Sequence, residues 1–268
     1  MGNERLDVLL VSRGLIDSRE KARTTIMAGL VYVDNQRIDK AGTKIDIHSK
    51  IMVKGNPLPY VSRGGLKLEK AIKDFKINLK DKICIDIGAS TGGFTDCMLQ
   101  NKAKKIYAID VGYGQLDWKL RQNNRVIVME RKNIRYVEKD DLDELADFAA
   151  IDVSFISLKL VIPVVKNLLE DSGGIVALIK PQFEVGKGKV GKGGVVRELS
   201  LHKKVVWDIV DFIQDLGLYI LDFTYSPVQG PKGNIEYLLY ISKNNEDKNL
   251  LDETLINHVL KDSHKNFR

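Results

Sequence analysis

The feature that most constrains the fold is a series of short apolar runs between residues 82 and 181, each as long as one β-strand. The runs are rich in Ile, Val and Ala, and helical stretches separate most of them. They occupy residues 82–88, 105–111, 125–130, 148–153 and 174–181. Strands that alternate with helices form a parallel sheet with helices on both faces. The sequence therefore predicts an α/β domain.

The last part of this domain follows a different order. One long amphipathic helix is expected over residues 198–217, and two further strands over residues 218–226 and 235–242. Because these two strands follow one another without a helix between them, they predict a hairpin and an antiparallel end to the sheet. The full expectation is a mostly parallel sheet of seven strands.

Residues 1–60 predict a separate, small α+β domain. Two helices are expected, the second starting at the N-cap Ser18, and they end at Gly14 and Gly29. Two strands follow, the first broken by a turn at Asp34 and Asn35. A segment rich in glycine and proline, 55–65, marks the boundary. The expected domains are therefore 1–60 and 61–268, the latter with a polar tail, 244–268, that ends in a short helix.

Composition limits the function classes. The 268 residues carry a net charge of +6, which permits a nucleic-acid partner without requiring one. No apolar run reaches the ~18–20 residues of a membrane span, and the N-terminus does not read as a secretory signal. The two cysteines, Cys84 and Cys97, and the four scattered histidines form no metal-ligand pattern. We expect a cytoplasmic protein with no metal and with reduced core thiols.

The glycine-rich turn DIGASTGGFTD, between the first predicted strand and a helix, indicates a nucleotide-like cofactor. Its glycines, at 88, 92 and 93, do not follow the G-x-G-x-x-G spacing that brings a backbone close to a pyrophosphate, because Ser90 takes the middle place. S-adenosylmethionine (SAM) has no phosphate, so it suits a turn that begins with the acid Asp86. A second acid, Asp110, ends the next strand, where a carboxylate can bind the two hydroxyls of a ribose.

Two other motifs are weighed and set aside. Gly186–Gly193 nearly matches a phosphate-binding loop, but Gly193 stands where the magnesium ligand Ser or Thr belongs. A basic loop near the substrate, or a plain solvated loop, explains it better. The stretch Arg5–Asp7 resembles a catalytic stretch of pseudouridine synthases, yet no matching catalytic domain follows. We expect it to lie on a face of the first helix.

Four charged residues fall where a methyl-transfer site is expected. Asp152 and Lys180 end two predicted strands, and the carboxyl ends of such strands face the ligand crevice. Lys67 lies in the helix before the cofactor strand, and Glu236 begins the last strand. Each alone could be an exposed strand or helix end. A lysine near a hydroxyl can act as a base or as a cation, and the sequence does not separate these roles.

Six segments together resemble the TlyA family of rRNA 2′-O-methyltransferases, whose catalytic domain is FtsJ-like and whose members also carry the name hemolysin A. They are SRGGLKL, DIGASTGGFTD, DVGYGQL, IDVSFISL, KPQFEVGKG and GNIEYLLY. The resemblance implies a Rossmann-like, SAM-dependent methyltransferase domain. It also implies a catalytic tetrad, which falls here on Lys67, Asp152, Lys180 and Glu236, with Lys180 nearest the proton transfer.

The same resemblance assigns the binding residues. It places SAM against Gly88, Ser90, Gly92 and Phe94, with Asp110 on its ribose and Asn133 near its adenine. The first sixty residues resemble the RNA-binding domain named for ribosomal protein S-four. Cations near the start of its second helix and on the basic loop are then expected to contact RNA phosphates. These cations are Arg19, Lys21, Arg23, Lys187, Lys189, Lys192 and Arg197.

The implied substrate is a cytidine ribose in bacterial rRNA within ribosomal subunits, where some members modify both subunits and others only the large one. Three alternatives stand beside this expectation: an RNA-binding module without catalysis, a membrane-lytic protein, and a base methyltransferase. The sequence shows neither the N-P-P-Y-like motif nor the cysteine-nucleophile motif expected of base methyltransferases. The four tetrad positions are intact, which favours an enzyme.

Overall fold

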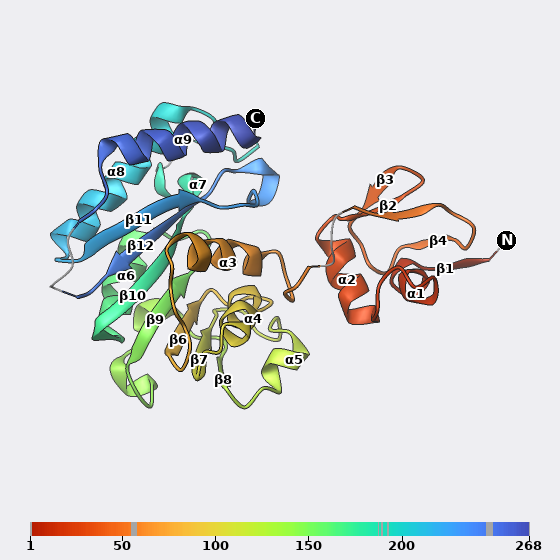
Figure 1. The fold of residues 1–268 in the computed structure, drawn as a ribbon, viewed down its shortest axis with the longest axis horizontal. Coiled ribbons are helices and arrows are strands. Elements are labelled where there is room, and N and C mark those ends of the chain that lie inside the picture. The colour runs from red at the N-terminus through yellow and green to blue at the C-terminus, as the bar shows by residue number, and fades with distance from the viewer. Residues whose placement is uncertain are drawn as a thin grey trace. The chain divides into compact units, whose positions relative to one another are not determined.

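The structure is a computed structural model that describes residues 2–54, 58–186, 188, 190, 191, 193–244 and 249–267. The chain forms two compact units, Met1–Gly65 and Leu66–Arg268 (Figure 1). The boundary lies at the end of the glycine- and proline-rich segment, a few residues beyond the expected position after residue 60.

The first unit contains two small sheets and two helices. Strand β1 (Asn3–Arg5) pairs with β4 (Lys44–Asp46), and β2 (Val31–Val33) pairs with both β3 (Gln36–Ile38) and β5 (Ile51–Val53). Helices α1 (Leu6–Ser12) and α2 (Arg19–Met27) pack on a core with Leu6, Leu10 and Ile26 at its centre. The first of these sheets, β1 with β4, was not predicted.

The local signals of this unit act as expected. The Ser18 side chain accepts a hydrogen bond from the Lys21 amide and so caps α2. Asp34 and Asn35 both have positive φ, as a tight turn between paired strands requires. Asp7 lies in α1, as expected, and Arg5 is the residue just before that helix. Asp7 is fully buried, and its carboxylate pairs with Arg5 and Arg19.

The second unit is built on a seven-stranded sheet in the order β11-β12-β10-β9-β6-β7-β8. Its strands are β6 (Ile83–Ile87), β7 (Lys105–Ile109), β8 (Val126–Met129), β9 (Ala146–Ile151), β10 (Leu169–Ile179), β11 (Tyr219–Tyr225) and β12 (Tyr237–Ser242). The five strands β6 to β10 run parallel, whereas β12 is antiparallel to both β10 and β11. The predicted α/β fold with an antiparallel end is confirmed.

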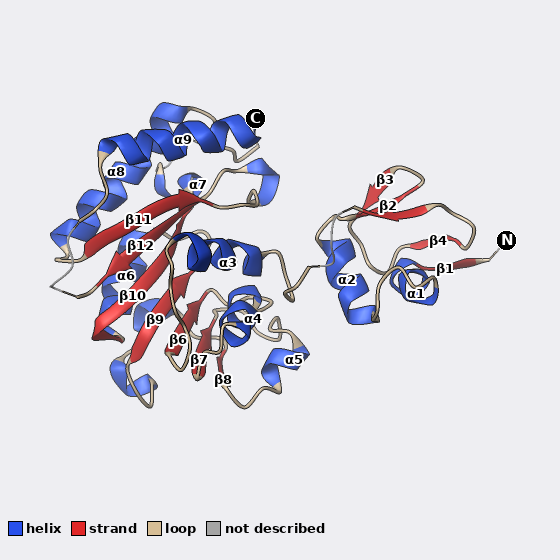
Figure 2. Ribbon diagram, in the orientation of Figure 1, coloured by secondary structure: helices blue, strands red, loops and turns tan. Residues whose placement is uncertain are grey.

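Helices cover both faces of this sheet, with α3 and α4 in front of it and α6 behind it in Figure 2. The helices are α3 (Gly64–Asp74), α4 (Gly93–Gln100), α5 (Trp118–Arg121), α6 (Leu158–Asn167), α7 (Pro181–Glu184), α8 (Leu199–Asp215) and α9 (Glu253–Phe267). Two short 3₁₀ turns, η1 (Ile134–Tyr136) and η2 (Lys139–Asp141), stand between β8 and β9 in place of a full helix.

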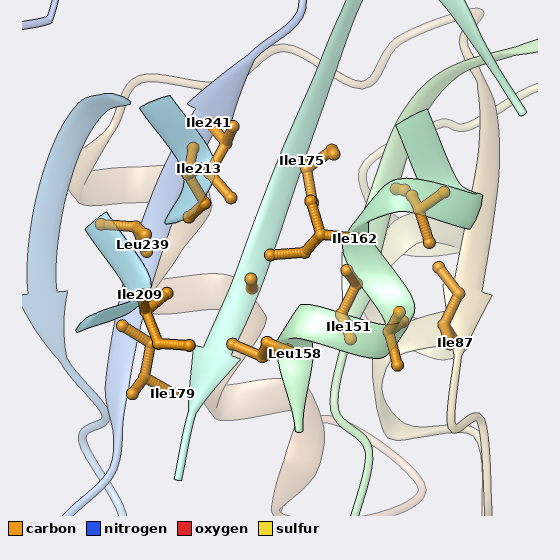
Figure 3. Close-up of a cluster of buried hydrophobic side chains, with 14 of the residues drawn as sticks. Ile87, Ile151, Leu158, Ile162, Ile175, Ile179, Ile209, Ile213, Leu239 and Ile241 are labelled. Carbon is orange, nitrogen blue, oxygen red and sulfur yellow. The ribbon is translucent and has the colours of Figure 1, made fainter. Parts of the chain in front are cut away.

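Branched apolar side chains fill the space between the sheet and helices α6 and α8. In Figure 3, Ile162 of α6 and Ile209 and Ile213 of α8 point toward sheet residues such as Ile175 and Leu239. Burial of these side chains fixes the sheet on which the site is built. In the described part of the chain, no helix is long and apolar enough to cross a membrane.

Candidate functional site

The sheet brings the predicted site residues to one edge. Gly88, Asp110, Asp152 and Lys180 each follow directly on the last residue of β6, β7, β9 and β10. Because these strands are parallel, the four residues leave the sheet at the same edge. The antiparallel strand β12 begins at this edge, with Tyr237 opposite Ile179. Glu236, just before Tyr237, is thereby placed beside Lys180.

The four predicted catalytic side chains form a continuous chain of ion pairs. Lys67 Nζ lies 2.8 Å from Glu236 Oε2 and 3.2 Å from Asp152 Oδ2. The other oxygen of Asp152 lies 2.5 Å from Lys180 Nζ. Lys180 also donates a hydrogen bond to Ser154 Oγ, at 3.1 Å. One carboxylate therefore joins the two lysines, and the four formal charges sum to zero.

The electrostatics of this chain stabilise its charged state. Burial alone would lower the pKa of Lys67, but the charges of Asp152 and Glu236 outweigh it, so the pKa is raised. Burial would likewise raise the pKa of Asp152, but the two lysine charges outweigh it and lower the pKa. Lys67 and Asp152 are consequently held ionised and act as a fixed frame around Lys180.

Glu236 sits in a space that only glycine at position 230 can provide. A Cβ added to Gly230 would lie 2.1 Å from Glu236 Oε1, which is too close for any atom. Oε1 is fully buried and has no hydrogen-bond partner among the described residues. Its partner oxygen, Oε2, binds Lys67. The loop before β12 therefore leaves one acceptor of this carboxylate open.

A cavity of about 730 Å³ opens beside this ion-pair chain. This volume is within the range of sites for drug-sized ligands. Five of the predicted site residues line it: Gly88, Ser90, Asp110, Asn133 and Asp152. The tetrad carboxylate Asp152 thus belongs both to the ion-pair chain and to the wall of the cavity.

The glycine-rich turn and Asp110 give this cavity its polar wall. Asp110 accepts hydrogen bonds from the amides of Ser90, at 2.8 Å, and Gly112, at 2.6 Å. Its two oxygens are therefore fixed, and each keeps a further lone pair for a ligand hydroxyl. Gly88 has φ +86°, and a Cβ there would lie 2.6 Å from the carbonyl oxygen of Asp152. These features fit the ribose of an adenosine-like ligand.

Three predicted cofactor residues lie elsewhere in the turn. Asp86, Gly92 and Phe94 are not among the residues that line the cavity. Asp86 is completely buried and accepts hydrogen bonds from the amide and hydroxyl of Thr95, at 2.8 and 2.6 Å. Burial raises the pKa of Asp86 to about 7, although the Thr95 hydrogen bonds act in the opposite direction. Asp86 therefore holds helix α4 against the turn.

Two contributors to the site, Ser154 and Phe155, had no role assigned from the sequence. Ser154 accepts a hydrogen bond from Lys180, and Ser154 and Phe155 line the cavity. Phe155 is 90% exposed, has φ +63°, and its ring lies 4.9 Å from that of Phe183. A large exposed aromatic residue in left-handed backbone is unusual and indicates a functional position. In the sequence, these residues belong to the segment SFIS shortly after β9, but the sequence alone does not reveal the strained backbone of Phe155.

The predicted RNA-contacting cations are only partly described. Arg19, Lys21 and Arg23 lie exposed on α2, with Arg19 and Arg23 one helical turn apart. Arg197 is also exposed. Lys187, Lys189 and Lys192 lie outside the described residues. No cluster of three or more His, Cys, Asp or Glu side chains suited to a metal ion occurs in the described ranges.

Comparisons with known proteins agree with this geometry. Residues 60–243 match the family of FtsJ-like methyltransferases, and residues 4–51 match the S4 domain. A Bacillus subtilis protein, YqxC, named as a candidate rRNA methyltransferase, is 52% identical over 99% of this chain and 95% of its own. The 16S/23S rRNA (cytidine-2′-O)-methyltransferase TlyA of Mycobacterium tuberculosis is 42% identical over 88% of this chain and 89% of its own.

A solved structure from Streptococcus thermophilus, named as a candidate hemolysin, has the same architecture. It is 49% identical, has a TM-score of 0.80, and the match covers 100% of this chain and 98% of that one. The family predicted from the six sequence segments is thereby confirmed. The chain belongs to the FtsJ-like methyltransferase family and, within it, to the TlyA proteins that join an S4 domain to this catalytic fold.

Proposed function

We propose that the protein transfers a methyl group from SAM to the 2′-oxygen of a cytidine ribose in bacterial rRNA. The observation that carries this proposal is the buried chain Glu236–Lys67–Asp152–Lys180 beside a ligand-sized cavity. A ribose hydroxyl is a weak nucleophile, and this chain supplies a positioned amine, Lys180, paired with the carboxylate of Asp152, which lines the cavity. The names of the relatives support the choice of rRNA and of cytidine.

The cavity lining supports SAM as the cofactor. Asp110 would hold the ribose hydroxyls of the adenosine, and Asn133 and Ile134 would flank the adenine. Bound SAM supplies a methyl group on a positively charged sulfur, so the S–CH₃ bond breaks as the new O–CH₃ bond forms. Asp152 lies at the cavity wall, and its negative charge favours a cation there.

Lys180 would either accept the proton of the attacking hydroxyl or stabilise the oxygen that loses it. Its amine has two polar partners, Asp152 and Ser154. When the amine is neutral, these two contacts use its two N–H groups and leave its lone pair for the hydroxyl proton. When the amine is charged, the third N–H group can instead stabilise the oxygen. Both arrangements direct Lys180 at the same oxygen atom, and the hydroxyl proton passes to the amine in the first arrangement and to solvent water in the second.

The exposed aromatic at the cavity mouth suits a nucleotide that has left its stack. Phe155 and Phe183 would support the base of the target cytidine while its ribose reaches Lys180. The exposed cations of α2 would contact phosphates elsewhere on the RNA without reading its sequence. We place the reaction in the cytoplasm, where ribosomal subunits are available as substrates, and we assign no metal to it.

Methyl transfer to separated, unmodified ribosomal subunits tests this function. Labelled SAM would be incubated with each subunit and with wild-type protein or the Lys180→Ala variant. We expect the wild type to label rRNA and the variant to bind SAM normally but to label poorly. An inactive wild type that binds RNA but no SAM would overturn the proposal in favour of an RNA-binding module.

A further inference from the structure

The loops around the cavity carry an unusual concentration of exposed aromatic side chains. Every strongly exposed aromatic residue among the described residues of the second unit comes from the segments that follow β7, β8 and β9. They are Tyr113, Trp118, Tyr136 and Phe155. Large exposed aromatic groups cost free energy in water, and those that also lie beside an exposed cation are candidates for a binding surface. Phe155 is already used for the target base, and the others are not.

Arginines accompany two of these aromatic residues. The guanidinium of Arg131 lies 4.2 Å from the ring centroid of Tyr113, and that of Arg135 lies 5.3 Å from the ring centroid of Tyr136. Both arginines are exposed, and neither forms an ion pair with a described carboxylate. By contrast, the neighbouring cation Lys132 is paired with Asp141. The two free guanidinium charges are available to an anionic partner.

The backbone holds these side chains in a defined place beside the cavity. The amides of Arg131 and Lys132 donate to the carbonyls of Gly112 and Asp110, at 3.0 Å each, and so join the loops after β7 and β8. Arg131 has φ +55°, a strained conformation for a residue with a side chain. Arg135 lines the cavity itself. We call Tyr113, Arg131, Arg135 and Tyr136 the tyrosine–arginine rim.

We propose that this rim binds an unpaired nucleotide adjacent to the target nucleotide. One face of Tyr113 is covered by Arg131, and the ring is 68% exposed, so its other face can stack on a base. The two guanidinium groups would bind the phosphates on either side of that base. Proteins bind single-stranded nucleic acids by stacking bases on aromatic rings beside cationic side chains, and this mode of binding tolerates different sequences. The inference rests on the proposed function, because it takes the mouth of the cavity, at Phe155, as the place of the target base.

Kinetics of the full-length protein on the accepted ribosomal subunit test the rim. Tyr113→Ala should raise KM for the subunit by about 5- to 100-fold, with kcat and the Kd for SAM within about twofold of wild type. Tyr113→Phe keeps the ring and should behave as wild type. Trp118→Ala is the matched control, since Trp118 is equally exposed but contacts no described arginine. It should also behave as wild type.

Three results would contradict the proposed binding of a nucleotide by the rim. An unchanged KM in Tyr113→Ala excludes stacking, an equal loss in Trp118→Ala excludes a specific site, and a weakened Kd for SAM makes the rim part of the cofactor site. The charge contribution has its own readout: Arg131→Ala should reduce the slope of log affinity against log salt by about one. An unchanged slope would contradict phosphate binding by Arg131.

A binding experiment separates failure of the rim from failure of the proposed function. Binding of a fluorescent oligocytidine and of a duplex of equal length is measured with wild type and Tyr113→Ala. The rim predicts that wild type prefers the single strand and that the variant loses this preference, even if no subunit is methylated. Equal binding of both RNAs by wild type would overturn the rim and favour a protein partner for this surface.

Discussion

Two carboxylates, one in each unit, share the same pattern of neighbours: Asp7 is fully buried and Asp152 is partly buried. Asp7 lies between Arg5 and Arg19, and Asp152 lies between Lys67 and Lys180. The pKa of each carboxyl is lowered by its cations. For Asp7 the main cause is the hydrogen bond from Arg5. For Asp152, burial would raise the pKa, but the charges of the two lysines outweigh it. Both carboxylates are therefore ionised at neutral pH.

The cations distinguish the two carboxylates. The arginines beside Asp7 are 45% and 60% exposed, whereas the lysines beside Asp152 are 11% and 8% exposed. A guanidinium cannot give up its proton, so the Asp7 cluster cannot take part in proton transfer. A lysine amine can give up or take a proton, which is the property that the proposed role of Lys180 requires. A carboxylate between two cations is therefore a candidate catalytic group only where the cations are lysines that can transfer a proton beside a ligand site, as we propose for Asp152 and Lys180.

The largest expected effect is on the catalytic side of this comparison. Lys180→Ala removes the amine to which we assign the reacting hydroxyl, and we expect methyl transfer to fall by ~10²–10⁴-fold. The Kd for SAM should stay within about twofold, because Lys180 does not line the cavity. Single-turnover transfer with saturating SAM measures the rate. Wild-type rates in the variant would remove Lys180 from the mechanism.

On the structural side, Asp7→Asn should affect folding and leave chemistry alone. The amide replaces a carboxylate that accepts from two guanidinium groups, so the first unit should lose about 1.5–3 kcal/mol of unfolding free energy. Urea unfolding of the full chain measures this loss. Asp17→Asn is the control, because Asp17 forms an exposed pair with Lys21 and such pairs contribute little. Equal losses in both variants would show that burial of Asp7 has no special role.

Asp86 is a third carboxylate, fully buried, with no cation beside it among the described residues. Burial raises its pKa to about 7 from an ordinary 3.8, so between these values the folded state keeps a proton that the unfolded state releases. Stability should therefore fall as pH rises through this window, by ~1–3 kcal/mol between pH 5 and pH 7.

Chemical denaturation at several pH values, in wild type and Asp86→Asn, measures this fall. The variant should lack the Asp86 contribution and show a shallower slope. Asp7 and Asp152 carry the opposite sign, since their stabilisation is present above the ordinary carboxyl pKa and is lost as pH falls through the lowered one. Identical slopes in wild type and Asp86→Asn would mean that Asp86 titrates in the ordinary range.

The smallest expected effect concerns the second partner of Lys180. Ser154→Ala removes one neutral hydrogen bond to the amine while Asp152 remains, so methyl transfer should fall by about 2- to 10-fold. Ser157→Ala is a useful control, because Ser157 lines the same cavity but bonds Glu184 instead of a tetrad lysine. A larger loss in Ser157→Ala than in Ser154→Ala would contradict the role given to Ser154.

The sheet and the placement of the tetrad could be predicted from sequence because both depend on regular patterns. Apolar runs identify strands, and parallel strands bring Asp152 and Lys180 to one edge without further information. The antiparallel β12 then places Glu236 at that edge as well. In contrast, β1 has the sequence NER and β4 the sequence KID, so neither strand shows an apolar alternation.

Features that depend on side-chain direction could not be predicted. Asp7 lies in an amphipathic helix, and only the folded core shows that it points inward to Arg5 and Arg19. Asp86 fits the pattern of a cofactor ligand, yet its carboxylate binds Thr95. The contact between Tyr113 and Arg131 joins residues from different loops, and local spacing carries no trace of it.

The most direct test of the central claim is the position of the transferred methyl group. Ribosomal RNA labelled by the wild-type protein would be digested to nucleosides and separated by liquid chromatography with mass spectrometry. The Lys180-centred mechanism predicts the label in 2′-O-methylcytidine alone. Label on a cytosine or other base, with the ribose unmodified, would contradict it.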